Sequence, residues 1–184
     1  MSIRASPPLP LKLFLFGQIG AGKSHCGRLL ARDFGFAFHD GDDDLTPAMR
    51  GAISSRVAFP PEMRRTFAEI LAARLGGLAT THARFCLAQG LFKNSERHHL
   101  RATLPDLVFV WVRASPEAIA ARLHTRTGHV ADAAYAAWAN PYFETPDFPH
   151  LTVDNHGDEA ALRRALVAAV GPPPADAARL SAPA

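Results

Sequence analysis

The chain has 184 residues, of which 48% are hydrophobic, and a formal net charge of +3. This length suffices to bury one sizeable core, so we expect one domain and no second full domain. Its basic residues are scattered without a run of four, which argues against a nucleic-acid partner. No apolar stretch reaches 18 residues, and residues 1–10 lack the apolar segment of a secretory signal. The sequence therefore predicts a cytoplasmic protein with no membrane partner.

The predicted strands and helices alternate along the chain. The first strand, Leu11–Phe16, is almost continuously apolar, which is typical of a strand that is covered on both faces of a parallel sheet. Four more strands are predicted at 36–39, 83–88, 107–112 and 151–153. With helices between them, the chain is expected to adopt an α/β fold: a three-layer P-loop NTPase fold with a five-stranded parallel sheet flanked by helices.

Capping residues and glycines predict the helix boundaries. Thr46 and Ser115 are expected to cap helices that begin at Pro47 and Pro116, and Gly76-Gly77 to end a helix over 62–75. Two further helices are predicted at 26–34 and 158–170. We expect a kinase domain over 11–171, between a flexible N-terminus (1–10) and a disordered tail (172–184) rich in Pro and Ala.

The most specific motif is a complete GxxxxGK[ST] phosphate-binding loop between the first strand and the first helix. Its glycines let successive N–H groups point at an anion, and the helix dipole adds positive potential. Lys23 is expected to reach the β- and γ-phosphates of ATP, and the Ser24 hydroxyl to ligate Mg²⁺. The candidate nucleotide-binding residues are Gly17, Gln18, Ile19, Gly20, Ala21, Gly22, Lys23, Ser24 and His25.

An acidic run follows the second strand, at the sheet edge where ligands bind. Asp40 and Asp42 lie nearest the strand end, so we expect them to bind an acceptor hydroxyl and take up its proton, with Asp42 also a candidate Mg²⁺ ligand. The alternative is a solvated turn that caps the next helix.

Polar residues also follow the third strand. Gln89 is a candidate substrate ligand. Arg97 and Arg101 share a helix face that could equally be solvated.

Arg122 and Arg126 repeat at a spacing of four residues just before Gly128, a possible hinge. Segment 125–149 has no strand period and is interpreted as a mobile flap (about 122–145) plus a connection. A closing flap would bring these arginines onto the transferring phosphate and exclude water. The alternative is an exposed pair of arginines at a helix end.

These motifs resemble the gluconate kinase family, within the small P-loop kinases that also include shikimate kinases. The similarity runs from about residue 13 to 170 and includes the phosphate loop, Asp40-Gly41-Asp42, Arg64, Cys86-Leu87-Ala88 and the segment from Arg122 to His129. The resemblance implies use of ATP and Mg²⁺, phosphorylation of a polar hydroxylated metabolite, Asp40, Asp42 and Arg64 near the acceptor, and Arg122 and Arg126 on nucleotide phosphates. Leu87 stands where the family has a serine, and we expect it on the acceptor side.

Other functions remain open at this stage. A shikimate kinase-like acceptor ranks second because Ala88-Gln89-Gly90 replaces the triple glycine that such enzymes carry after the third strand. A nucleoside or nucleotide kinase is a further possibility. A regulator that binds nucleotide without transferring phosphate is the alternative from another class. The expected partner is a small-molecule acceptor, and the protein is expected to be a monomer or homodimer.

Overall fold

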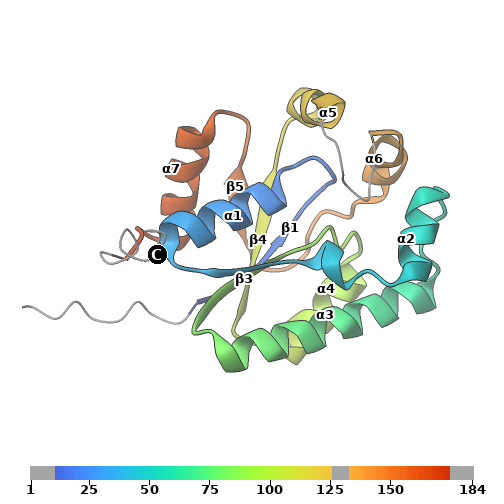
Figure 1. Ribbon diagram of the computed structural model, residues 1–184, viewed down its shortest axis with the longest axis horizontal. Helices are drawn as coiled ribbons and strands as arrows, with labels where there is room; N and C mark the ends of the chain where they lie inside the picture. Colours follow the sequence, from blue (N-terminus) through green and yellow to red (C-terminus); the bar gives the residue numbers. More distant parts are fainter. Residues whose placement is uncertain (1–10, 126–132, 175–184) are drawn as a thin grey trace, which may run out of the picture.

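The computed structural model describes residues 11–125 and 133–174. They form a three-layer α/β structure with a five-stranded parallel sheet in the middle (Figure 1). The strands are β1 (Leu11–Phe16), β2 (Ala37–Asp40), β3 (Arg84–Ala88), β4 (Leu107–Arg113) and β5 (Leu151–Asp154). Their order across the sheet is β2-β3-β1-β4-β5. The predicted fold class is confirmed.

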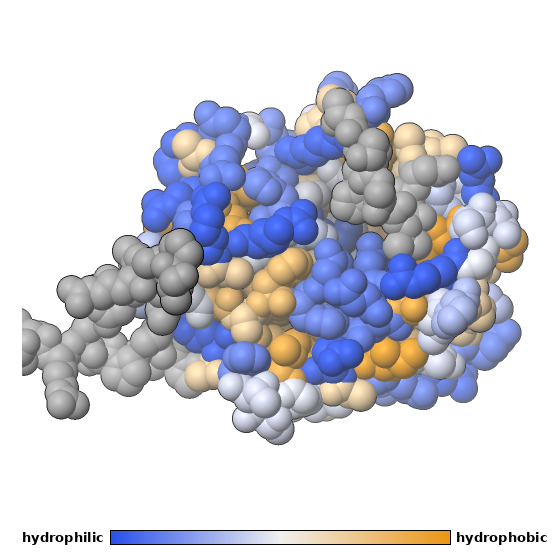
Figure 2. Space-filling view, in the orientation of Figure 1, coloured by the Kyte–Doolittle hydropathy of each residue, from blue (hydrophilic) through white to orange (hydrophobic). Residues whose placement is uncertain are grey.

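Helices cover both faces of this sheet, with α1 and α7 on one side and α3 and α4 on the other (Figure 1). The helices are α1 (Lys23–Phe34), α2 (Pro47–Ser54), α3 (Pro61–Thr81), α4 (Asn94–Thr103), α5 (Pro116–Thr125), α6 (Ala133–Ala139) and α7 (Glu159–Val170). Two short 3-10 helices span Gly41–Asp44 and Asn140–Tyr142. No helix among the described residues is both long and apolar enough to cross a bilayer. The face in Figure 2 is largely hydrophilic, with hydrophobic side chains in small patches.

The central strand β1 supplies both halves of the core. Leu13 and Leu15 join the apolar cluster beneath α1 and α7, whereas Phe14 and Phe16 join the cluster beneath α3 and α4. All four side chains are fully buried, as the continuous apolar run of this strand predicts. Burial on both faces fixes β1 in the middle of the sheet, and the loop that follows it therefore starts from a rigid support.

Both predicted helix caps, Thr46 and Ser115, are present together with a third at Asp158, and each accepts a hydrogen bond from the backbone amide three residues further on. The capping side chains are Thr46 at 3.3 Å, Ser115 at 3.2 Å and Asp158 at 2.8 Å. A cap of this kind is worth about 1 kcal/mol. Local sequence therefore determines where these three helices begin.

The predicted end of α3 at Gly76-Gly77 is wrong, because the helix continues to Thr81. Leu75 and Leu78, on either side of the glycine pair, pack into the same apolar cluster below the sheet. Burial of a leucine stabilises the helix by about 1.5–3 kcal/mol, which outweighs the roughly 1 kcal/mol that each glycine costs in a helix interior. Tertiary packing thus overrides the stop signal.

Two other expectations need correction. The first helix begins at Lys23 rather than at residue 26, because Gly22 takes the left-handed conformation and serves as its N-cap. The segment from 125 to 149 contains the helix α6, whose Ala136 and Ala139 are buried against Ile19. Residues 126–132, which belong to the predicted flap and include Arg126, lie outside the described ranges, as do 1–10 and 175–184.

Candidate active site

The phosphate-binding loop joins β1 to α1 and requires glycine for two separate reasons. Gly17, Gly20 and Gly22 have φ angles of 152°, 86° and 95°, which side chains rarely allow. A Cβ atom on Gly17 would lie 2.3 Å from the Val112 carbonyl oxygen, and one on Gly22 would lie 2.3 Å from Asn155 Nδ2. Backbone conformation and close packing therefore both exclude larger residues.

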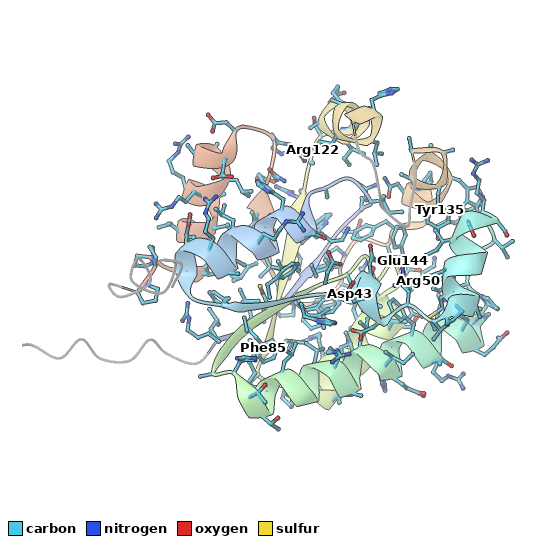
Figure 3. The ribbon with its side chains drawn as sticks, in the orientation of Figure 1. Asp43, Arg50, Phe85, Arg122, Tyr135 and Glu144 are labelled. Atoms are coloured by element: carbon cyan, nitrogen blue, oxygen red, sulfur yellow. The ribbon has the colours of Figure 1, made fainter. Side chains whose placement is uncertain are left out.

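Two side chains from the second half of the chain hold the carbonyl side of this loop. Arg122 Nη1 donates to Ala21 O at 3.3 Å, and its Nη2 donates to Asn155 O at 2.8 Å. The buried Asn155 side chain donates to Ala21 O at 2.9 Å. Arg122 thus lies beside the loop, at the base of α5 (Figure 3). With its carbonyls bound on the outside, the loop is free to direct amide groups inward, toward an anion.

Asn140 holds the opposite side of the loop. Its side-chain oxygen accepts from Ile19 N at 2.8 Å, and its Nδ2 donates to Ile19 O at 3.0 Å. Gln18 Nε2 makes a longer bond, of 3.4 Å, to Asn140 O. Sequence reasoning missed both Asn140 and Asn155, because each lies more than 100 residues from the loop and belongs to no local motif.

At the start of α1, three consecutive side chains point to different places. Lys23 Nζ donates to Gln18 O at 2.9 Å and borders a cavity, which Ser24 also lines. The exposed His25 instead faces Glu159 of α7 at 3.9 Å and does not line that cavity. Only the backbone amide of His25, in the first turn of the helix, is positioned as an anion donor.

The acidic run after β2 divides into side chains with different roles. Asp40 Oδ1 accepts from the Asp42 amide at 3.2 Å and so caps the 3-10 helix, while Asp42 Oδ1 accepts from Gln89 Nε2 at 3.0 Å. Both carboxylates line the cavity. Asp44 points elsewhere, to His39 Nε2 at 2.6 Å and Arg74 Nη2 at 2.7 Å. Burial alone would raise the pKa of Asp44, but these two hydrogen bonds lower it below its ordinary value.

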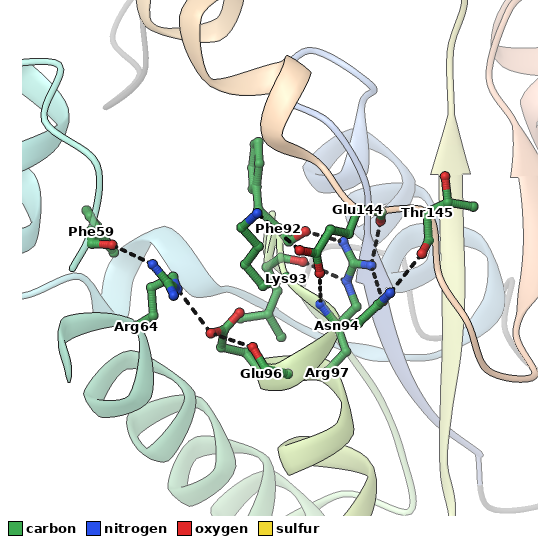
Figure 4. Close-up of polar contacts among 11 residues, drawn as sticks. Phe59, Arg64, Phe92, Lys93, Asn94, Glu96, Arg97, Glu144 and Thr145 are labelled. Carbon is green, nitrogen blue, oxygen red and sulfur yellow. Dashed lines mark hydrogen bonds and ion pairs between the residues drawn. The ribbon is translucent and has the colours of Figure 1, made fainter. Parts of the chain in front are cut away.

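The part of the cavity wall where the acceptor was expected contains a three-residue polar contact (Figure 4). Arg64 Nε donates to Glu96 Oε1 at 3.2 Å, and Arg64 Nη1 donates to Phe59 O at 2.8 Å. Arg64 and Glu96 both line the cavity. Leu87, expected on this side, is fully buried in the core and does not line the cavity, so that expectation is wrong.

Arg97 is fully buried, which contradicts the interpretation of Arg97 and Arg101 as a solvated helix face. It donates to the backbone oxygens of Leu91, Phe92 and Glu144 at 2.7–2.9 Å, and it also donates to Asn94 Oδ1 (Figure 4). Burial lowers its pKa below the ordinary arginine value, to about 10, so it stays charged at neutral pH. Arg97 therefore joins the cavity wall at 91–92 to the segment that follows the second 3-10 helix.

These elements enclose a cavity of about 400 Å³. It brings together seven predicted site residues: Ile19, Lys23, Ser24, Asp40, Asp42, Arg64 and Gln89. Its other lining residues are largely apolar or aromatic, among them Phe59, Phe67, Phe92, Tyr135, Trp138 and Tyr142. The predicted site residue Arg126 lies outside the described residues.

The described side chains suit one kind of metal ion. They contain no group of three His, Cys, Asp or Glu residues that could enclose a metal. Mg²⁺ needs no such cage, because it binds through one or two carboxylates together with substrate phosphates and water. Ser24 and Asp42, which border the same cavity, fit that requirement.

The two cysteines are not candidate nucleophiles. Burial raises the pKa of the Cys26 thiol to about 12 and also raises the pKa of the Cys86 thiol, so both stay protonated at neutral pH.

Comparisons with known sequences and structures match this chain to small kinases. A family model described as shikimate kinase matches residues 19–136. A shikimate kinase from Caulobacter vibrioides (strain NA1000 / CB15N) is 31% identical over 168 residues, covering 78% of this chain and 79% of the relative. A gluconokinase structure from Sinorhizobium meliloti 1021 aligns with a TM-score of 0.73 and 25% identity over 95% of both chains. A sugar kinase structure from Janibacter sp. HTCC2649 shares the fold, with a TM-score of 0.74 and 20% identity over 89% of this chain and 97% of that one.

Proposed function

The chain belongs to the shikimate kinase family of small P-loop kinases and is an ATP-dependent kinase with a hydroxyl acceptor, and we propose that this acceptor is a carbohydrate-type metabolite. One observation carries the proposal: the phosphate loop and the two carboxylates after β2 line one cavity, with Arg64 and Gln89 on its acceptor side. Polyphosphate donor and hydroxyl acceptor would thus meet in one enclosed space, as phosphoryl transfer requires.

We assign the following roles to the residues of this site. The inward amides of the loop and the Lys23 ammonium would bind the β- and γ-phosphates and stabilise charge as the phosphoryl group moves. The acceptor oxygen forms a bond to the γ-phosphorus while the bond to ADP breaks. Asp40 or Asp42 would accept the hydroxyl proton, and Gln89 holds Asp42 in place for this step.

Mg²⁺ would be held by Ser24 and Asp42, and when bound it neutralises charge on the phosphates. Arg122 would act on the nucleotide through the loop, since it contacts the loop carbonyls of Gly20 and Ala21. Arg64, which lines the cavity, would orient the acceptor.

The acceptor can be narrowed to two candidates. A sugar or sugar acid is the first, supported by the gluconokinase likeness, which spans nearly the whole chain, and by the polar residues that border the cavity. A shikimate-like acceptor is the second, supported by the family model. Because the described carboxylates of the site face the cavity, we rank a regulator that transfers nothing below both kinases.

The test is a coupled measurement of ADP release with MgATP over sugars, sugar acids, polyols, shikimate and nucleoside monophosphates. We expect one class to raise ADP release well above the rate without acceptor, and Lys23→Ala to remove that increase. Identical rates with and without every compound would contradict the kinase function.

We further propose that the enzyme is cytoplasmic, is a monomer or homodimer, and has no nucleic-acid or membrane partner. Its two free thiols suit a reduced compartment.

A further inference from the structure

The only arginine that lines the cavity among the described residues is already paired. Arg64 Nε lies 3.2 Å from Glu96 Oε1, and the Glu96 side chain is only 9% exposed. Arg64 Nη1 donates to Phe59 O, so the backbone also holds the guanidinium in place. An acceptor carboxylate would have to share this arginine with a buried carboxylate of the protein, which repels it. Arg64 is therefore a poor receptor for an acid.

The other acceptor-side cation is also matched by a carboxylate. Lys93 Nζ lies 3.1 Å from Glu144 Oε1 (Figure 4). Glu144 is held in turn by the Asn94 amide at 2.7 Å, which lowers the pKa of Glu144 and keeps it ionised. Lys93 thus adds little unbalanced positive charge to the cavity.

The remaining charges on the acceptor side are negative. Asp40 accepts from the Asp42 amide and Asp42 from Gln89, both neutral donors, and neither has an ion-pair partner within the described ranges. Lys23 lies with the phosphate loop, so its charge serves the nucleotide. Counted over residues 11–125 and 133–174, the acceptor half of the cavity is consequently balanced or slightly negative, which disfavours an anionic acceptor and favours a neutral or cationic one.

Aromatic rings of α6 and of the 3-10 helix that follows it form another part of the cavity wall. Tyr135 and Trp138 of α6 have ring centroids 5.5 Å apart, and Trp138 and Tyr142 have centroids 5.7 Å apart. All three line the cavity. The negative face of an aromatic ring packs well against the apolar face of a ring compound and attracts ammonium groups.

From these observations we propose that the acceptor carries no carboxylate and is a neutral or amino-bearing ring sugar, whose apolar face packs on Tyr135 and Trp138. The proposal rests on the proposed kinase function and narrows it, because it separates sugars from the sugar acids and cyclic acids that the family resemblance also allows. Glu96 is then a specificity-determining residue, since it occupies the arginine that an acid would need.

Three pyranoses with the same ring test the charge of the acceptor: glucuronate, glucose and glucosamine. We expect kcat/KM of glucose or glucosamine, measured by ADP release, to exceed that of glucuronate by at least about tenfold, the effect of one unfavourable charged contact. A wild-type preference for glucuronate would overturn the proposal. Where turnover is too slow to rank them, intrinsic tryptophan fluorescence in a Trp111→Phe background, with MgADP present, measures binding. Binding of glucuronate alone, or of none of the three, would also overturn it.

Glu96→Gln tests the mechanism directly, because it leaves the side chain in place and removes the competing charge. We expect the glucuronate-to-glucose ratio of kcat/KM to rise about tenfold. Asp43→Asn is the matched control: it removes the same charge from an exposed residue outside the cavity and should leave the ratio unchanged. An unchanged ratio in Glu96→Gln, with normal MgATP binding, would contradict the role of Glu96. Lys23-dependent phosphorylation of an acid would overturn this inference while preserving the kinase function.

Discussion

Asn140 and Ile19 form a reciprocal pair of hydrogen bonds, in which one side-chain amide binds both polar groups of a single backbone residue. The two bonds, of 2.8 and 3.0 Å, fix the peptide groups on either side of Ile19 in the middle of the phosphate loop. A loop that is ordered before its ligand arrives loses less conformational entropy when it binds. Asn140 therefore acts on the nucleotide without having to touch it.

Asn140→Ala removes both bonds, so we expect the Kd for MgATP to rise by about 10- to 100-fold, as two lost hydrogen bonds imply. Isothermal titration calorimetry measures this directly. Asn94→Ala is a suitable control, because Asn94 also binds a backbone carbonyl, that of Thr145, but lies away from the loop. Equal nucleotide affinity in wild type and Asn140→Ala would show that the loop keeps its conformation without this contact.

Lys23→Ala should abolish phosphoryl transfer and leave the fold intact. The partly exposed lysine adds little to packing but supplies charge to the transition state, so turnover should fall by about 10²-fold or more. Lys23→Arg should restore little, since a planar guanidinium does not replace a compact ammonium inside the loop. Steady-state rates with MgATP test both variants, and thermal melting confirms that they fold. A rate within a factor of a few of wild type would exclude a catalytic role for Lys23.

Asp→Asn substitutions at positions 40 and 42 distinguish the candidate proton acceptors. Loss of the true base should lower kcat by about 10²- to 10⁴-fold with nucleotide affinity unchanged, because the carboxylate is needed for the proton and not for polyphosphate. The comparison uses kcat and the Kd of an ATP analogue for each variant. If both Asp→Asn variants were fully active, the acidic residues after β2 would serve only as a turn that caps the 3-10 helix Gly41–Asp44.

The lowered pKa of Asp44 predicts that the stability of the folded protein depends on pH. Its pKa is lower in the folded than in the unfolded chain, so its contribution is complete above the unfolded pKa and is lost as the pH falls through the folded pKa. Asp44→Asn should therefore be less stable than wild type at pH 7, and the difference should shrink below about pH 4. Urea unfolding at pH 7 and pH 3 measures it. Asp43→Asn should have the same free energy of unfolding as wild type at both pH values. If Asp44→Asn were destabilised by the same amount at pH 7 and pH 3, the lowered pKa of Asp44 would not explain the effect.

Arg97 and Arg101 lie one helical turn apart and should respond very differently to substitution. Arg97→Met leaves three buried backbone oxygens without their donor, so we expect the free energy of unfolding to fall by about 3 kcal/mol or more. Arg101→Met should change it by about 1 kcal/mol at most, since Arg101 is partly exposed and stacks on Phe148. Chemical denaturation of both variants makes the comparison. Similar decreases in the free energy of unfolding for the two variants would show that the buried hydrogen bonds of Arg97 do not add to stability.

The sequence is sufficient to predict those features that depend on neighbouring residues. The phosphate loop, the caps at Thr46 and Ser115, and the apolar run of β1 are local patterns, and each forms as expected. The positions of Asp40 and Asp42 at the cavity follow from a general property of parallel sheets, whose carboxyl ends share one edge.

Features that depend on distant residues could not be predicted. The pair Arg64 and Glu96 joins α3 to α4, and the contact of Asn155 with the loop joins β5 to β1. No spacing rule connects such residues before the topology is known. Burial cannot be read from a charged side chain alone, which is why the sequence leaves a solvated Arg97 open as an alternative. For the same reason, the packing that carries α3 past its glycine pair could not be predicted.

The contacts that shape the phosphate loop also constrain when it can work. Asn140 follows Ile19 by 121 residues, and Asn155 follows Ala21 by 134. A ribosome releases the loop long before it releases the side chains that hold it. Nascent chains that end before residue 155 should therefore have little affinity for nucleotide, and the nucleotide site should form only after residues 140–155 have emerged.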